Sequence, residues 1–256
     1  MNKINIILFL IITIVIIKIF FNYNENYITN NNIEIVVSRY NERLDWLKDE
    51  PFNDNPVIIY NKGNNDDYIN ASNIIKTIKL SNVGREGHTY LYHIINNYNN
   101  LADVTVFLPG SVNLSYKYER SKNIIKKVKE TMNTIFACTV QENIVDENYN
   151  FQLDKYLSTD HSNNKINKDD NMKLSKTRPY GKWFNNTFKN GEKNNCIASH
   201  GIFAISKEHI LQKPKSYYEN LIIELNDHHN PEVGHYFERS WYAVFYPYNE
   251  NINIIN

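Results

Sequence analysis

The chain has 256 residues and a formal net charge of zero, because 28 basic residues balance 28 acidic ones. This length is sufficient for one sizeable hydrophobic core. The balanced charge excludes the general basic surface with which many proteins bind nucleic acids. We therefore expect a globular protein that has no nucleic-acid partner.

The N-terminus has the composition of a membrane anchor. Residues 4–21 are apolar apart from three polar or charged positions. A membrane-spanning helix needs about 20 apolar residues, and Lys18 near the end can extend to the interface. Cleavable signal peptides end in small residues, whereas this segment ends in bulky ones. We predict an inner tail at 1–3, an uncleaved signal anchor at 4–21 and a stalk at 22–32, with a removed signal peptide as the alternative.

The charges around the predicted anchor indicate its orientation. Lys3 and the α-amino group precede the anchor, and Lys18 lies near its other end. The slight bias favours an N-terminus inside, so we expect a single-pass membrane protein whose globular domain is lumenal or external. In such a compartment Cys138 and Cys196 can form a disulfide, or they can remain as two buried thiols. No arrangement of Cys and His indicates a zinc site, and we expect no metal and no cofactor.

Residues 33–250 are expected to form a single domain of the α/β class. Strand-like apolar runs at 33–38, 57–60, 76–80 and 104–108 alternate with helical patterns. Such an alternation predicts a mainly parallel sheet with helices on both faces.

The stretch 82–98 organises this domain. Its apolar residues recur at helical spacing, and Asn82 is positioned to cap the N-terminus of the helix. The first turn, 84–88, combines two glycines with Arg, Glu and His. Helix N-termini attract anions, and glycine lets a ligand approach the backbone. This favours a site for a phosphorylated or acidic ligand; the alternative is an ordinary capped helix whose Arg85 and Glu86 pair with neighbours.

Polar residues follow the strand-like runs where these runs end. They lie at 39–42, 61–62, 84–88 and 110–111. In an open α/β sheet, ligands bind beyond the carboxyl ends of the strands. We therefore expect these four segments to converge in one site.

The middle of the domain is more polar. Ser121 is positioned to cap a helix whose lysines indicate a solvated face. Periodicity then fades over 141–195, which predicts a polar excursion. Ser206 is positioned to cap a short helix, and a further helix is expected after Pro214.

The C-terminal part of the domain adds further candidate site residues. A strand is predicted at 197–205, and it contains His200. A helix is predicted at 235–246, with Glu238 and Arg239 in its first turn and away from its apolar stripe.

Three blocks of the sequence resemble a family of proteins of unknown function that occurs in fungi, algae, bacteria and large DNA viruses and is regarded as glycosyltransferase-like. The blocks are 36–47 with 58–63, then 82–91 with 103–108, and finally 201–206 with Pro214, 217–218 and 238–241. The resemblance implies the architecture of an A-type nucleotide-sugar glycosyltransferase, in which one α/β domain binds the donor at the strand ends.

The resemblance has one departure that concerns metal binding. Many A-type enzymes place an Asp-x-Asp after the strand that corresponds to 104–108, where it binds a metal on the donor diphosphate. Pro109, Gly110 and Ser111 stand at that position here. The resemblance therefore implies either a metal-free enzyme that uses Arg85, Lys62 and the helix N-terminus to compensate the phosphate charge, or a protein that is not a transferase.

The resemblance also implies roles for individual residues. In an inverting transferase a carboxylate deprotonates the acceptor hydroxyl, and Glu238 is the first candidate for this base and Glu86 the second. The expected partners are a nucleotide-sugar donor and a glycan or protein acceptor. A non-catalytic membrane or virion surface protein that retains the fold for ligand binding is the alternative. The residues expected to bind substrate are Arg39, Asn41, Glu42, Asn61, Lys62, Gly84, Arg85, His88, Ser111, His200, Arg239 and Trp241.

Overall fold

The computed structural model describes residues 32–68, 70–138, 140, 142, 144–154, 172–189, 193–249 and 252–255. The predicted inner tail, the predicted anchor and the stalk up to residue 31 lie outside this set. Among the described residues, no helix combines the length and the apolar character that crossing a membrane requires.

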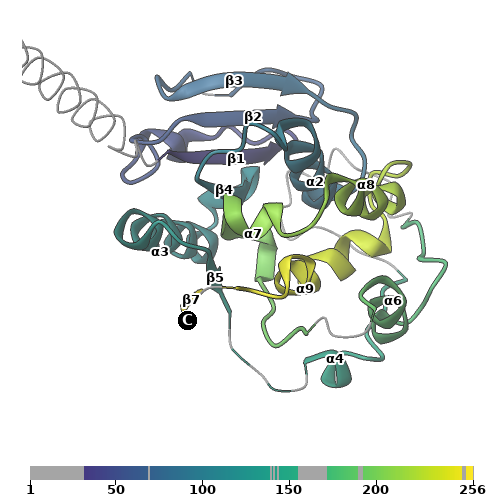
Figure 1. Ribbon diagram of the computed structural model, residues 1–256. Helices are drawn as coiled ribbons and strands as arrows, with labels where there is room; N and C mark the ends of the chain where they lie inside the picture. Colours follow the sequence, from purple (N-terminus) through teal and green to yellow (C-terminus); the bar gives the residue numbers. More distant parts are fainter. Residues whose placement is uncertain are drawn as a thin grey trace, which may run out of the picture. The chain divides into compact units, whose positions relative to one another are not determined.

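The strands of the described residues form one seven-stranded sheet in the order β3-β2-β1-β4-β6-β5-β7 (Figure 1). They are β1 (Ile33–Arg39), β2 (Val57–Asn61), β3 (Ile74–Lys79), β4 (Val104–Pro109), β5 (Ile135–Ala137), β6 (Phe203–Ser206) and β7 (Asn253–Ile255). The first four run parallel to one another, and β7 runs parallel to β5. β6 is antiparallel to both of its neighbours, β4 and β5. The predicted α/β class is confirmed, with β6 as a reversed strand within the sheet.

The burial of the strands follows their position in the sheet. Every residue of β2 and of β4 is buried. Continuous apolar runs of this kind are typical of strands that are covered on both faces. β3 lies at the edge of the sheet, and its exposed residues include Lys76 and Lys79. Charged side chains on an edge strand disfavour pairing with another chain.

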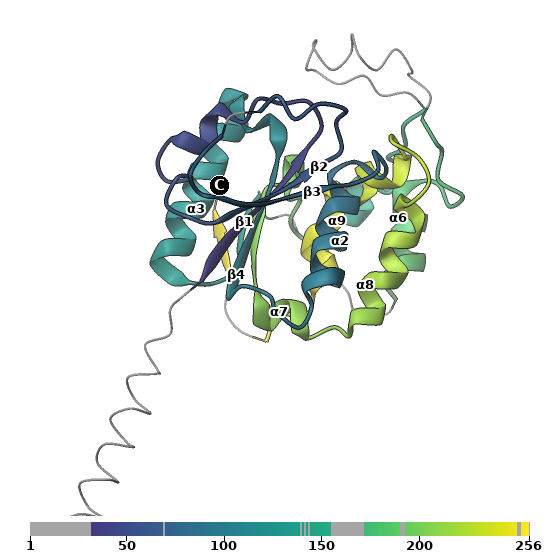
Figure 2. The same cartoon turned by 90° about the horizontal axis from the view of Figure 1, so that it is seen from above.

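Helices cover both faces of the sheet (Figures 1 and 2). On one face, η1 and α3 bring Trp46 and Ile124 into a buried cluster with Val37 of β1. On the other face, α2, α6, α8 and α9 form a larger buried cluster that includes Leu91 and Val36. The helices of the described chain are η1 (Asp45–Lys48), α2 (Arg85–Asn97), η2 (Gly110–Asn113), α3 (Ser115–Thr131), α4 (Ile144–Glu147), α6 (Tyr180–Thr187), η3 (Ser199–Gly201), α7 (Lys207–Leu211), α8 (Lys215–Ile222), η4 (Ile223–Leu225) and α9 (Glu232–Phe245).

Two of the predicted helix caps are wrong. The N-cap of α2 is Gly84, which has no side chain to accept a hydrogen bond, and not Asn82. Ser121 lies inside α3 and is buried, because α3 already begins at Ser115. The first turn and a half of α3 is polar, so the apolar periodicity that guides a sequence-based prediction starts too late.

The other predicted helix boundaries lie closer to the observed ones. Ser206 caps α7 as predicted, since its Oγ accepts a main-chain N–H from within that helix. α9 begins at Glu232, directly after Pro231, and not at residue 235. Proline is favoured next to a helix start, where its missing N–H is not needed. Glu238 and Arg239 therefore lie in the second turn of α9 and not in its first.

Sequence periodicity missed the shortest elements. β5 and β7 have three residues each, which is too few for an alternating pattern. β7 also extends the domain beyond residue 250, the predicted end. The predicted strand at 197–205 is two elements, the turn η3 followed by β6.

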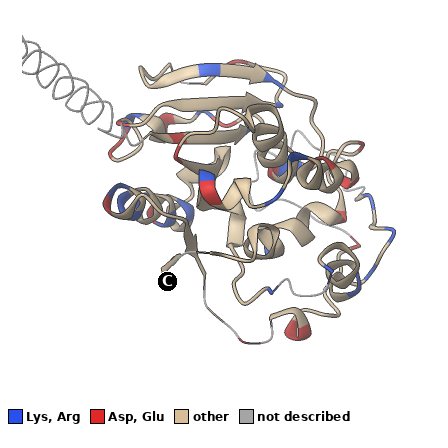
Figure 3. Cartoon of the chain, in the orientation of Figure 1, with Lys and Arg blue, Asp and Glu red and all other residues tan. Residues whose placement is uncertain are grey.

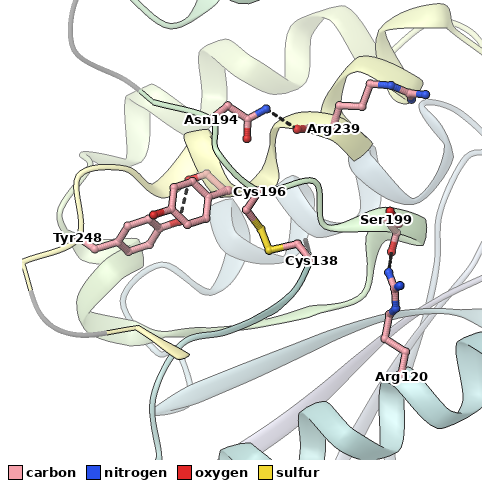
Figure 4. The surroundings of a disulfide bond; sticks show 8 residues. Arg120, Cys138, Asn194, Cys196, Ser199, Arg239 and Tyr248 are labelled. Atoms are coloured by element: carbon pink, nitrogen blue, oxygen red, sulfur yellow. Dashed lines mark hydrogen bonds between the residues drawn. A yellow bond between two sulfur atoms is a disulfide. The ribbon is translucent and has the colours of Figure 1, made fainter. Parts of the chain in front are cut away.

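Cys138 and Cys196 form a disulfide, which settles the choice that the sequence left open. Their Cα atoms are 5.5 Å apart. The bond joins the residue after β5 to the segment that leads into η3 (Figure 4). It therefore closes a loop that contains the polar excursion at 141–195.

The described parts of this excursion are attached to α9 through the fully buried carboxylate of Glu232. This carboxylate accepts hydrogen bonds from the main-chain N–H groups of Leu153 and Ser175, at 3.0 and 2.9 Å. It also accepts from Nε of Arg178 at 3.1 Å and from the hydroxyl of Tyr236 at 2.7 Å. One side chain thus holds two segments that lie far apart in the excursion.

We expect Glu232→Ala to lower the free energy of unfolding by about 2–5 kcal/mol, because it leaves the buried main-chain N–H of Ser175 and the buried hydroxyl of Tyr236 without their acceptor. Urea unfolding followed by circular dichroism measures this change. The matched control is Glu219→Ala, which removes an exposed helical pair with Lys215 and should have little effect. Equal unfolding free energies for the two variants would contradict the prediction.

Candidate active site

The strand directions bring several chain segments to one edge of the sheet. The carboxyl ends of β1, β2, β3 and β4 share this edge because these strands are parallel. β6 is reversed, so its beginning and the preceding η3 lie there as well. The segments 39–42, 61–62, 84–88 and 110–111, which the sequence predicts to converge, therefore meet and are joined by His200.

The guanidinium of Arg39, at the end of β1, is fully buried and is held by hydrogen bonds within the protein. Its Nε donates to the carbonyl of Glu42 at 2.7 Å, its Nη1 to Oδ1 of Asn61 at 2.8 Å, and its Nη2 to Oδ1 of Asn65 at 2.7 Å. Burial lowers the pKa of Arg39, and the nearby carboxylate of Glu42 opposes this effect. Arg39 and Asn61 therefore join the loops after β1 and β2 and position the edge of the sheet.

Asn41 and Glu42 form the turn after β1. Oε2 of Glu42 accepts the main-chain N–H groups of Tyr40 at 2.7 Å and of Asn41 at 3.1 Å. Oδ1 of Asn41 accepts from Nδ2 of Asn65 at 3.2 Å. A Cβ atom at Gly110 would lie 2.6 Å from Oε2 of Glu42, so the loop after β4 needs glycine to approach this closely.

Lys62 holds the turn before α2. Its Nζ donates to the carbonyl oxygens of Val83, at 2.6 Å, and of Arg85. Burial lowers the pKa of Lys62 to about 7. Burial, reinforced by the charge of Lys62, also lowers the pKa of His88 to about 4, so this imidazole is neutral at pH 7. Both side chains lie beneath the turn and are less than one-tenth exposed.

The turn itself has left-handed backbone at two successive residues, Gly84 with φ +61° and Arg85 with φ +51°. The N–H of Gly84 donates to the carbonyl of His228 at 2.7 Å. A Cβ atom at Gly84 would lie 2.4 Å from the carbonyl oxygen of Leu225. Nη1 of Arg85 lies 3.4 Å from Oδ1 of Asn230, and the Arg85 side chain is 22% exposed.

A second left-handed pair, His200 with φ +68° and Gly201 with φ +65°, lies next to the first. The N–H of His200 donates to Oε1 of Glu238 at 2.7 Å. The carbonyl of Gly201 accepts from the hydroxyl of Tyr90 at 2.9 Å. A Cβ atom at Gly201 would lie 3.0 Å from Cγ of Glu86, so the two turns are in contact. Left-handed residues other than glycine are uncommon and cluster at functional sites.

Two carboxylates of this edge are partly exposed, Glu86 at 14% and Glu238 at 19% of their side chains. Oε2 of Glu86 lies 3.7 Å from Nε of Arg85, so the pairing that the sequence left open as a structural alternative is present. Glu238 binds His200 through Oε1. Within the described part of the chain, Oε2 of Glu238 has no hydrogen-bond partner and is the atom that can accept a proton.

The beginning of α3 contributes three residues that the sequence analysis missed, Tyr116, Lys117 and Arg120. Nζ of Lys117 donates to Oγ of Ser111 at 2.7 Å. Nη1 of Arg120 lies 3.4 Å from the carbonyl of Ser199, immediately before His200 (Figure 4).

The basic character of α3 obscured this contribution. Lys and Arg occur along most of the helix (Figure 3), and a row of lysines of this kind indicates a solvated face. A usable signal was present, because α3 starts directly after β4 and η2 and its first turn must therefore lie at the carboxyl edge. Tyr116 is 51% exposed, and its ring centroid lies 4.9 Å from that of His200.

Two predicted site residues have other surroundings. Trp241 is fully buried, and its ring packs against Phe203 with a centroid distance of 5.2 Å. The guanidinium of Arg239 lies over the ring of Phe151 at 3.4 Å, and its Nη1 donates to the carbonyl of His235 at 3.1 Å. Trp241 is thus part of the core, and Arg239 lies against the polar excursion.

Comparisons with known proteins identify a family. Residues 35–253 match the family described as "Protein of unknown function (DUF3431)". The search of curated proteins finds no match. Among the described residues, no three His, Cys, Asp or Glu side chains are grouped closely enough to hold a metal ion.

The buried histidines make folding stability depend on pH. Burial lowers the pKa values of His88, His93 and His235 to about 4, 3 and 2. Below pH 6.5 the unfolded chain binds protons at these residues while the folded chain does not, so stability falls as the pH falls. Each group contributes up to about 1.4 kcal/mol per pH unit.

Glu34 opposes this trend, because burial raises its pKa to about 7 and the folded state binds its proton first. Three histidines outweigh one carboxyl group, so we expect the melting temperature to decrease steadily from pH 6.5 to pH 4. Scanning calorimetry over this range measures the slope. A melting temperature that increases toward pH 4 would show that the sign is wrong.

Proposed function

This chain belongs to DUF3431, a family of unknown function, and we propose that it is a membrane-anchored glycosyltransferase that transfers a sugar from a nucleotide-sugar donor to a glycan or protein acceptor. The observation that carries the proposal is the charge arrangement at the carboxyl edge of the parallel strands. There Arg85 pairs with Glu86, the ammonium group of Lys117 is close enough to Glu86 and Glu238 to interact with both carboxylates, and Arg120 contacts the carbonyl of Ser199 beside His200.

This arrangement of charges meets two chemical requirements of glycosyl transfer. The leaving group is a nucleoside diphosphate, whose growing negative charge is stabilised by fixed cations. The acceptor hydroxyl must lose a proton as it attacks, which requires a carboxylate or an imidazole nearby. Arg85 supports the first demand, and Glu238 with its available Oε2 supports the second.

The proposed reaction forms one bond to the anomeric carbon and breaks another. The acceptor oxygen forms a bond to the anomeric carbon of the donor, and its proton passes to Oε2 of Glu238. The bond between the anomeric carbon and the diphosphate oxygen breaks, and its electron pair stays on the diphosphate. The hydrogen bond from His200 to Oε1 keeps the carboxylate in one orientation during this step. Glu86, which lies against Arg85, is the second candidate for the base.

The disulfide supports the proposed location. Disulfides form and persist in oxidising compartments such as the lumen of the secretory pathway or the cell exterior. The bond between Cys138 and Cys196 agrees with a domain that the predicted anchor at 4–21 holds on the lumenal or external side.

One set of contacts favours the alternative of a non-catalytic binding protein. Arg39, Asn61 and Lys62, which were expected to bind substrate, use their hydrogen bonds within the protein.

The two functions differ in turnover and not in ligand binding. Full-length protein in detergent, incubated with UDP-sugars and GDP-sugars, is expected to release UDP or GDP. Binding of these donors without release would favour the alternative.

We expect Arg85→Ala to weaken nucleotide-sugar binding by about 10- to 100-fold, because a charge-assisted hydrogen bond is lost. Isothermal titration calorimetry measures the change, with the nucleotide sugar from which the wild-type protein releases UDP or GDP. Lys129→Ala is the matched control, since it removes a positive charge that pairs with Asp54 away from the site. An Arg85→Ala protein that is folded and binds the donor normally would assign Arg85 a structural role.

We expect Glu238→Gln to reduce turnover by about 10²–10⁴-fold while donor affinity stays near the wild-type value, because the change removes the base and conserves the shape. Glu208→Gln on α7 is the control and should turn over normally. Normal turnover by Glu238→Gln would exclude Glu238 as the base, and the same test would then apply to Glu86→Gln.

A further inference from the structure

Lys117 lies near the carboxyl end of β4. It lies in the first turn of α3, which follows β4 and η2 without a long connection. Its ammonium group donates one hydrogen bond to Oγ of Ser111. Within the described residues, no other hydrogen-bond partner occupies this ammonium group, so two of its N–H groups are available to a ligand.

The charges around Lys117 place it at the centre of the candidate site. Burial lowers the pKa of Lys117 most strongly, and Arg85 lowers it further. The carboxylates of Glu86, Glu238 and Glu42 oppose this shift, and each is therefore close enough to interact with the ammonium group. Burial lowers the pKa of the His200 imidazole to about 4, and the charges of Lys117 and Arg120 lower it further, so Lys117 also interacts with His200.

The residues at this strand end do not fit a divalent cation. Pro109, Gly110 and Ser111 supply no carboxylate at the end of β4. Glu42 is the carboxylate packed on Gly110, and its Oε2 already accepts two main-chain N–H groups. A metal bound at Ser111 would also be repelled by the ammonium group that contacts Ser111.

We propose that Lys117, and not a metal ion, supplies the positive charge that neutralises the donor diphosphate. This inference rests on the proposed glycosyltransferase function and assigns a residue to its leaving-group site. Two other buried cations are less suitable. Lys62 donates to the carbonyl oxygens of Val83 and Arg85, and the fully buried Arg39 donates from all three of its nitrogens to the loops after β1 and β2.

In the transfer step, Lys117 remains protonated and moves no proton. Its two available N–H groups donate to the diphosphate oxygens while the bond from the anomeric carbon breaks and leaves its electron pair on the diphosphate. The acceptor proton goes to the base, so Lys117 changes only the stability of the leaving group. A fixed ammonium group acts as a point charge, which is how lysine contributes to phosphate sites in other proteins.

The experiment measures binding of UDP and GDP to the full-length protein in detergent by calorimetry, once with EDTA and once with manganese. The wild-type protein should bind one of these diphosphates equally well in both buffers. Lys117→Met should lose about 10- to 100-fold in affinity for the diphosphate. Its affinity for uridine or guanosine, which carry no phosphate, should not change. Lys117→Arg should stay within a few-fold of wild type.

Lys122→Met is the matched control, because Lys122 lies on the same helix and pairs with Glu119 near the surface. It should bind UDP and GDP like the wild type. A wild-type protein whose diphosphate binding is lost in EDTA and restored by manganese would overturn the role of Lys117, even if Lys117→Met fails to fold. Normal binding by a folded Lys117→Met would do the same.

The failure of the proposed function is distinguishable from these outcomes. If the wild-type protein binds neither UDP nor GDP in either buffer, there is no diphosphate to neutralise, and both proposals are wrong. If it binds them and a folded Lys117→Met also binds them like the wild type, the glycosyltransferase proposal stands and the assignment of Lys117 is wrong.

Discussion

The candidate site depends on two left-handed turns that hold each other in place. Left-handed backbone at residues other than glycine costs of order 1–3 kcal/mol each and persists only where the surrounding structure enforces it. Here Lys62 fixes the turn at Arg85, while Glu238 and Tyr90 fix the turn at His200. Gly201 lies against Cγ of Glu86, so the two turns pack against each other.

The reversed strand β6 and the disulfide bring the second half of the chain to this pair of turns. A fifth parallel strand next to β4 would have placed η3 at the opposite edge of the sheet. The antiparallel direction of β6 instead starts that strand beside the carboxyl ends of β1 and β4. The bond between Cys138 and Cys196, which are 58 residues apart, anchors the segment just before His200.

The same packing separates structural polar groups from those that can reach a ligand. Arg39 and Lys62 are buried and use their donors within the protein, and His88 is held neutral by burial. Lys117 and Glu238 keep hydrogen-bonding atoms without a partner in the described residues and remain partly accessible. Few of the many polar side chains at this edge of the sheet are therefore able to contact a ligand.

The elements with a local signal can be predicted from the sequence. Three parallel strands are predicted by the continuous apolar runs at 33–38, 57–60 and 104–108. The polar residues that follow these runs predict the edge of the sheet where the strand ends meet. The spacing of apolar residues and the order of the segments along the chain suffice for these two predictions. Only the tertiary contacts show that the two cysteines pair, that Arg39 donates to the loops after β1 and β2, and that Lys117 reaches Ser111. These outcomes depend on which partners the fold places within hydrogen-bonding distance, and a residue's neighbours along the chain do not contain that information.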